Sequence, residues 1–161
     1  MSQLKNKTIL SLILIFSIFA LIAAYFIQYT LGHKPCNLCL IERLPYIFAI
    51  FLITFVLILK KFKKFIFILL VLTFISATFI SFYHYGIEQG FFKESLACDA
   101  GDEINELSKE NLLRELKNKS TSCKDINFTI FGLSLATINT FISLALSIIT
   151  IKIFLNYEKN K

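Results

Sequence analysis

Two pairs of cysteines are the residues of this chain whose type and spacing could do chemistry. Cys36 and Cys39 form a Cys-x-x-Cys sequence directly after an apolar run, and Cys98 and Cys123 bracket the one long polar stretch. Two residues between cysteines make a tight ring, which adds little loop-closure stabilisation. That spacing instead favours reversible dithiol–disulfide exchange or the binding of a metal ion. Cys98 and Cys123 could by themselves simply close a structural loop.

Metal binding by the first pair would require further ligands. His33, three residues before Cys36, and the second cysteine pair are the candidates. A zinc site of four cysteines normally uses two close pairs, whereas Cys98 and Cys123 are far apart in the sequence. We therefore expect no metal ion and favour redox chemistry. A helix is expected to begin at the first pair, and the backbone N–H groups there favour a thiolate.

Arg43 and His84 are the other candidate site residues. Arg43 follows Cys39 by four residues, so on a continuous helix the two would share a face. Its guanidinium could steady a thiolate or polarise a carbonyl oxygen of a ligand, although an interfacial arginine that reaches headgroups would look the same. His84 lies between two tyrosines at the end of an apolar run. Such a histidine is either an interfacial anchor or a hydrogen-bond donor to a quinone carbonyl.

The elements that must position these residues are membrane spans. Of the 161 residues, 56% are hydrophobic, against about 45–50% in an average soluble domain. A helix needs about 20 apolar residues to cross the hydrocarbon, and four segments meet or nearly meet that length. They are residues 8–29, 40–59, 65–85 and 128–155. Pro45 falls in the opening turns of the second span, where N–H groups lack partners anyway.

The first span is expected to be a retained helix. Its apolar run is longer than that of a signal peptide, and no small-x-small cleavage site precedes Tyr25 and Phe26. The net charge of +6 does not indicate nucleic acid, because the lysines cluster at the ends of apolar runs.

The lysines predict the orientation of the spans. Cytoplasmic loops carry an excess of lysine and arginine. Lysines precede the first span, fill the turn between the second and third, and end the chain, whereas residues 86–127 hold nine of the 11 acidic residues. Both termini are therefore expected in the cytoplasm, with loops 30–39 and 86–127 and all four cysteines on the outer, oxidising side. The lysines on which this orientation rests are Lys5, Lys7, Lys60, Lys61, Lys63, Lys64, Lys152, Lys159 and Lys161.

The long loop is expected to contain a short amphipathic helix. Apolar residues recur at roughly helical spacing among the charges of residues 102–118. The polar residues 117–122 just before Cys123 predict a flexible segment that lets this cysteine move. The fold expected is an all-α membrane protein: a single domain over residues 1–161, built as a bundle of four transmembrane helices.

The sequence Cys36-Asn37-Leu38-Cys39-Leu40-Ile41-Glu42-Arg43 resembles the signature of the DsbB family, membrane thiol oxidases that recharge periplasmic DsbA. The resemblance covers nearly the whole chain, including four spans, the first pair at the head of the second span and the second pair in the long loop. It also includes Phe131-Gly132-Leu133-Ser134-Leu135 and the segment from Tyr83 to Glu88.

This resemblance implies a multi-pass protein of the bacterial inner membrane with four catalytic cysteines. A reduced periplasmic DsbA-like thioredoxin-fold partner would attack the Cys98–Cys123 disulfide at Cys98, and Cys123 would then exchange with Cys36. Cys39, released as a thiolate, would pass the electrons to a quinone (ubiquinone or menaquinone), which Arg43 and His84 would bind. Thiolate reactivity and leaving-group pKa govern each exchange.

The chain departs from the family pattern in three places. Asn37 is polar, residues 92–97 lack the prolines expected before the third cysteine, and aligning His84 needs a one-residue gap in some members.

Two other functions fit parts of the sequence. One is an enzyme like vitamin K epoxide reductase, which normally places its Cys-x-x-Cys ahead of the last span rather than the second. The other is a non-enzymatic membrane subunit with a structural disulfide loop, which would tolerate replacement of Cys36 or Cys39.

Overall fold

The protein is a bundle of four long helices with a small polar end. The computed structural model describes residues 2–59, 63–93, 98, 122–124, 129–130 and 132–159. Its elements are α1 (Ser2–Tyr29), α2 (Asn37–Ile41), α3 (Leu44–Leu59), α4 (Lys63–Glu88), β1 (Thr129–Ile130), β2 (Leu133–Ser134) and α6 (Leu135–Lys159). Among the described residues, four helical stretches are long and apolar enough to cross a membrane, which confirms the predicted class. The helix predicted in residues 102–118 lies outside the described residues.

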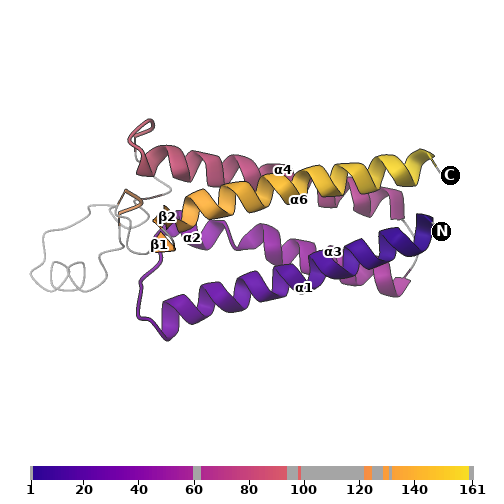
Figure 1. The fold of residues 1–161 in the computed structure, drawn as a ribbon, viewed down its shortest axis with the longest axis horizontal. Helices are drawn as coiled ribbons and strands as arrows, with labels where there is room; N and C mark the ends of the chain where they lie inside the picture. The colour runs from indigo at the N-terminus through magenta and orange to yellow at the C-terminus, as the bar shows by residue number, and fades with distance from the viewer. Residues whose placement is uncertain are drawn as a thin grey trace, which may run out of the picture.

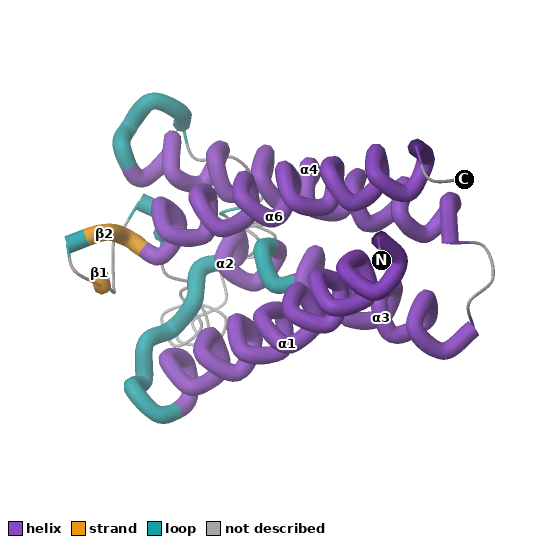
Figure 2. The backbone as a smooth tube through the Cα atoms, turned by 45° about the vertical axis from the view of Figure 1, so that its right-hand side comes forward, coloured by secondary structure: helices purple, strands orange, loops and turns teal. Residues whose placement is uncertain are grey.

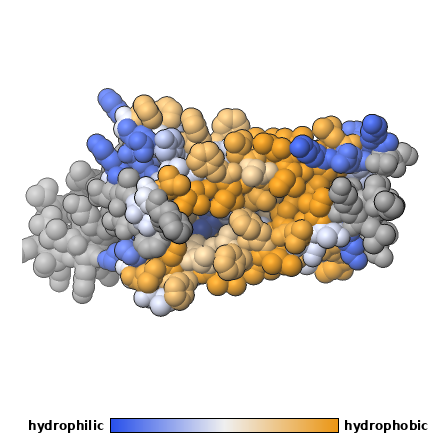
Figure 3. All heavy atoms as spheres, in the orientation of Figure 1, coloured by the Kyte–Doolittle hydropathy of each residue, from blue (hydrophilic) through white to orange (hydrophobic). Residues whose placement is uncertain are grey.

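The bundle is apolar outside and partly polar inside, as expected of helices in lipid. Large apolar side chains such as Phe19, Phe51 and Phe79 are exposed. Apolar residues also cover most of the helical part of the face drawn in Figure 3. Inside the bundle, the buried hydroxyls of Ser17 and Ser143 donate to the carbonyl four residues earlier in their own helix. Small hydroxyl residues of this kind let membrane helices approach closely. Helices α4 and α6 lie side by side, as do α1 and α3 (Figure 1).

The second span is broken into α2 and α3. We expected one helix over residues 40–59, but the helical stretch begins at Asn37 and is interrupted after Ile41, where a turn separates α2 from α3 (Figure 2). Pro45 explains the break, because it has no N–H for the carbonyl of Ile41 and its ring crowds that carbonyl. As the second residue of α3, Pro45 needs no helical partner. Because of this break, Glu42 and Arg43 lie in a turn and not in a regular helix.

The fourth span starts later than the expected residue 128, because a small hairpin precedes it. Strands β1 and β2 pair antiparallel, with Ile130 opposite Leu133. Gly132 in the connection has a φ of +80°, a conformation that favours glycine. Helix α6 begins directly after β2, at Leu135.

The two ends of the bundle differ in their contents. Both termini lie at one end, and α2 with the hairpin lies at the other (Figure 1). At the terminal end, Lys64 of α4 and Glu158 of α6 form an exposed ion pair of 2.7 Å. The cysteine pairs are therefore at the end opposite the termini and Lys64. Which end faces the cytoplasm stays a prediction from the lysines.

Candidate functional site

The first cysteine pair caps a short helix. Cys36 is the N-cap of α2, and its sulfur accepts a hydrogen bond from the backbone N–H of Cys39 at 3.2 Å. The two Sγ atoms lie 2.7 Å apart. Cys36 is buried, whereas Cys39 is only partly so. The geometry suits a pair that alternates between dithiol and disulfide.

The second pair lies against the first. Cys98 and Cys123 form a disulfide, and both are buried in one cluster with Cys36. Asn37 Nδ2 donates to the carbonyl oxygen of Cys98 at 3.3 Å, which joins the two cysteine loops directly. The sequence predicted that a flexible segment at residues 117–122, of which 117–121 lie outside the described residues, lets Cys123 move. Here it is 2% exposed and already packed in the same cluster.

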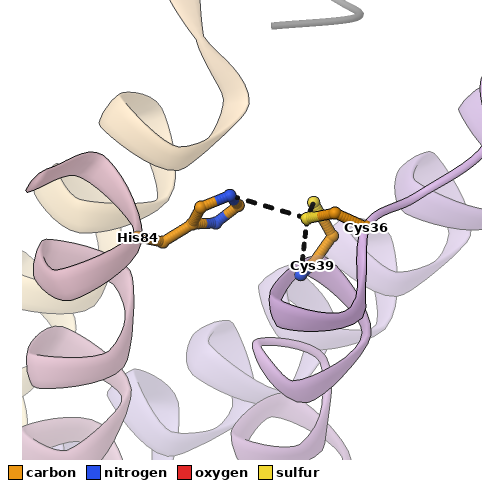
Figure 4. A group of neighbouring side chains, drawn as sticks. All are labelled: Cys36, Cys39 and His84. Carbon is orange, nitrogen blue, oxygen red and sulfur yellow. Dashed lines mark hydrogen bonds between the residues drawn. The ribbon is translucent and has the colours of Figure 1, made fainter. Parts of the chain in front are cut away.

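His84 of α4 faces the first pair (Figure 4). Its Nε2 lies 3.5 Å from Cys36 Sγ, and its Nδ1 lies 2.8 Å from Glu42 Oε1. An ionised carboxylate only accepts hydrogen bonds, so Nδ1–H is the donor and Nε2 is the atom presented to sulfur. His84 is 2% exposed. The sequence could not distinguish whether His84 is an interfacial anchor or a site residue. The structure places it inside the cysteine site.

A buried polar network holds Glu42 behind His84. Asn139 of α6 donates from Nδ2 to Glu42 Oε2 and to Ser81 Oγ, each at 2.8 Å, and accepts from the Tyr46 hydroxyl at 2.6 Å. Sequence reasoning did not select Glu42 or Asn139 as site residues. The available signal was a polar side chain inside an apolar span, which normally marks a functional site.

Glu88, one turn beyond His84, links α4 to the hairpin. Its Oε2 accepts a hydrogen bond from Ser134, whose hydroxyl also contacts Thr137 Oγ1 at 2.8 Å. Glu88 Oε1 lies 3.9 Å from His84 Nε2. The hairpin that displaces the start of the last span thereby fixes a second carboxylate beside His84.

Cys36 is the more acidic thiol of the reduced pair. The pKa of its thiol is lowered to about 4, first because the Cys39 thiol donates a hydrogen bond to its sulfur and then because His84 lies beside it. Burial acts in the opposite direction but is outweighed. A thiolate at neutral pH makes Cys36 both a nucleophile and a good leaving group.

Arg43 lies near the pair but points toward α1. Its Nη1 donates to Gln28 Oε1 at 2.7 Å, and its guanidinium lies 5.0 Å from the centre of the Tyr25 ring. The break after Ile41 removes the regular four-residue relation to Cys39 that we had assumed. Arg43 and Cys39 nevertheless line the same cavity.

That cavity has a volume of about 340 Å³ and is mainly apolar. Its walls come from α1 and α6, including Phe16, Ala20, Ala23, Ile27, Ile138 and Ile142. Its polar lining includes Cys36, Cys39, Arg43, His84, Asn139 and Cys123. A hollow with hydrophilic atoms at its floor is visible in the apolar face of the bundle (Figure 3). A pocket of this size, apolar with a few convergent polar groups, is typical of small-molecule sites.

The arrangement fits a flat, hydrophobic ring bearing carbonyl oxygens, such as a quinone. The apolar walls suit the ring and tail, and the guanidinium of Arg43, which lines the cavity, has N–H groups for the oxygens. Ligation of a metal is also chemically open to this site, because Cys36, Cys39 and His84 have their donor atoms within 4.8 Å of one another. His33, the ligand suggested by the sequence, is not in that group.

The described residues include four helical stretches long and apolar enough to cross a membrane, and a dithiol pair packs against a disulfide at one end of them. These features are typical of a multi-pass membrane thiol oxidoreductase. The chain matches the family model of disulfide bond formation protein DsbB over residues 6–153. It is also 32% identical over 155 residues to uncharacterized protein RP370 of Rickettsia prowazekii (strain Madrid E), covering 94% of this chain and 90% of that one. The chain therefore belongs to the DsbB family, whose members serve disulfide-bond formation.

Proposed function

We propose that this protein is a thiol:quinone oxidoreductase that reoxidises a periplasmic DsbA-like dithiol protein. The observation that carries the proposal is the packing of both cysteine pairs in one cluster that borders an apolar cavity. The two pairs connect a protein substrate on one side with a lipid-soluble oxidant on the other.

The electrons pass through two thiol–disulfide exchanges. A thiolate of the partner attacks Cys98, the Cys98–Cys123 bond breaks, and the partner's second thiol resolves the mixed disulfide. Cys123, now a thiolate, attacks Cys36 of the oxidised first pair, and Cys39 leaves. Each exchange transfers two electrons from one dithiol to the next disulfide, because one S–S bond forms as another breaks.

The second pair then returns to its disulfide, and the first pair takes up the two electrons. Cys98 attacks Cys123 in the inter-pair disulfide, which frees Cys36 as a thiolate and leaves the first pair reduced. His84 stabilises the charge on Cys36, and Glu42 keeps the imidazole turned toward that sulfur.

A quinone bound in the cavity would be the final acceptor of two electrons and two protons. Cys39 and Arg43 both line this cavity, and apolar side chains of α1 and α6 form its walls. The nitrogen atoms of Arg43 and His84 would donate to the oxygen atoms of such a ligand, where a hydrogen bond from a charged group is strongest.

The proposed location is the inner membrane of a bacterium, with the cysteine end in the periplasm and both termini in the cytoplasm. The partner is a thioredoxin-fold protein that approaches from the periplasm, and the quinone comes from the membrane pool as ubiquinone or menaquinone.

Purified protein in detergent, mixed with a reduced DsbA-like protein and a soluble quinone, tests this function. The expected result is stoichiometric quinone reduction and partner oxidation, lost in Cys36→Ser. Partner oxidation that continues without any quinone, or quinone reduction that survives Cys36→Ser, would contradict it.

A further inference from the structure

The geometry points to a redox-gated binding site for a thiophilic divalent cation, Zn²⁺ by chemistry, formed by Cys36, Cys39 and His84. Two sulfurs and one imidazole nitrogen, all within 4.8 Å of one another, are the ligand types that zinc prefers. Cys36 and Cys39 lie at the start of α2 and His84 lies on α4, and all three line the cavity. Figure 4 shows the imidazole turned toward the sulfur of Cys36. Binding itself requires neither a quinone nor a partner protein.

The distances fit tetrahedral coordination after one small movement. With Zn–S bonds of about 2.3 Å and a Zn–N bond of about 2.0 Å, sulfur and nitrogen ligands lie about 3.5 Å apart. Cys36 Sγ and His84 Nε2 are 3.5 Å apart. Two sulfur ligands lie about 3.8 Å apart, so the Sγ atoms, now at 2.7 Å, must separate by about 1 Å. Cys39 is only partly buried, so its side chain has room to turn.

The surroundings of His84 provide an independent argument. Metal-binding histidines almost always donate their second ring N–H to a carboxylate or carbonyl, which fixes the ring and raises its basicity. Glu42 Oε1 does this at 2.8 Å, and Asn139 holds the same carboxylate from behind at 2.8 Å. The nitrogen aimed at the sulfurs is thus already oriented as a ligand. The fourth position faces the cavity, from which water would complete the tetrahedron.

The oxidation state of the pair controls this site. A disulfide has no thiolate to offer, so the cation binds only the reduced pair and displaces the remaining thiol protons. While it is bound, both sulfurs are occupied and the disulfide cannot re-form. If the proposed function holds, a thiophilic cation therefore inhibits turnover by trapping the reduced first pair.

Cadmium titration of the full-length protein in detergent tests the site without any quinone. The parent for this titration is the Cys98→Ser/Cys123→Ser variant, which removes the second pair as a competing dithiol. After reduction and removal of the reductant, one Cd²⁺ per chain should bind and produce the ultraviolet thiolate-to-cadmium absorption, and Zn²⁺ should displace it. The oxidised parent should bind none. A folded, reduced parent that binds no Cd²⁺, or an oxidised one that binds equally well, overturns the inference.

Two histidine variants separate this site from general thiol affinity. His84→Asn should weaken binding at least about tenfold, and Glu42→Gln about 10- to 100-fold, since loss of an outer carboxylate has that effect. His33→Asn is the matched control, because His33 lies three residues from Cys36 but outside the ligand group, and it should leave the affinity unchanged. Equal weakening by both histidine changes, or none by His84→Asn, contradicts the assignment. Failure of quinone reduction would refute the proposed function but not the site, which the titration reads directly.

Discussion

Replacing Asn139 by leucine should loosen the bundle at the cysteine end. Asn139 makes three hydrogen bonds to other helices, at 2.6, 2.8 and 2.8 Å, to Tyr46, Glu42 and Ser81. Interhelical hydrogen bonds in a membrane average about 0.6 kcal/mol, so three contribute about 2 kcal/mol to the free energy of unfolding. Leaving the buried Glu42 carboxylate without this partner adds about 1–3 kcal/mol. We expect Asn139→Leu to lower the free energy of unfolding by about 3–5 kcal/mol.

Equilibrium unfolding in mixed micelles of rising sodium dodecyl sulfate content measures this loss, followed by the near-ultraviolet circular dichroism of the tyrosines. Thr140→Val is the matched control one residue along, because the Thr140 hydroxyl donates only to Ala136 O in its own helix at 2.8 Å. The control should change the free energy of unfolding by less than about 0.5 kcal/mol. If Asn139→Leu unfolds at the same detergent composition as Thr140→Val, the polar network does not hold the helices together.

Three further results are expected. Arg43→Ala should slow the quinone half-reaction roughly 10- to 150-fold, because a charge-assisted hydrogen bond contributes about 1.5–3 kcal/mol. Arg43→Lys should recover only part of the lost rate. If rapid mixing shows that partner attack on Cys98 slows equally, the role of Arg43 is structural. Asn37→Leu removes the hydrogen bond to the Cys98 carbonyl and should slow exchange between the pairs about 2- to 10-fold, and an unchanged exchange rate in stopped flow would refute its positioning role. A membrane-impermeant thiol reagent should label all four reduced cysteines in right-side-out but not inverted vesicles; labelling of the first pair from the cytoplasmic face would reverse the proposed orientation.

The helices and the end of the bundle that carries the cysteines could be predicted from the sequence. Runs of about 20 apolar residues leave a membrane helix as the main choice, because it satisfies its own backbone. Four such helices put both loops with cysteines at the same end. Cys36 and Cys39 could be selected because their spacing has few structural uses.

The details that depend on contacts between distant residues could not be predicted. Pro45 was visible as a helix-start residue, but its effect on the carbonyl of Ile41 depends on where the helix begins. The packing of α4 places His84 next to Cys36, although His33 is much closer to Cys36 in the sequence. Asn139 lies 97 residues from Glu42, so nothing local indicates their hydrogen bond.

The central claim is that electrons pass from the second cysteine pair to the first by direct exchange between Cys123 and Cys36. The most direct test is the Cys39→Ser variant, in which Cys36 is a lone thiol that can attack Cys123 of the Cys98–Cys123 disulfide and release Cys98 as a thiol. After incubation without partner protein or quinone and quenching with acid and an alkylating reagent, peptide mass spectrometry should find a Cys36–Cys123 disulfide together with alkylated Cys98. Recovery of Cys36 only as a free, alkylated thiol, with Cys98 and Cys123 still joined to each other, would contradict the account.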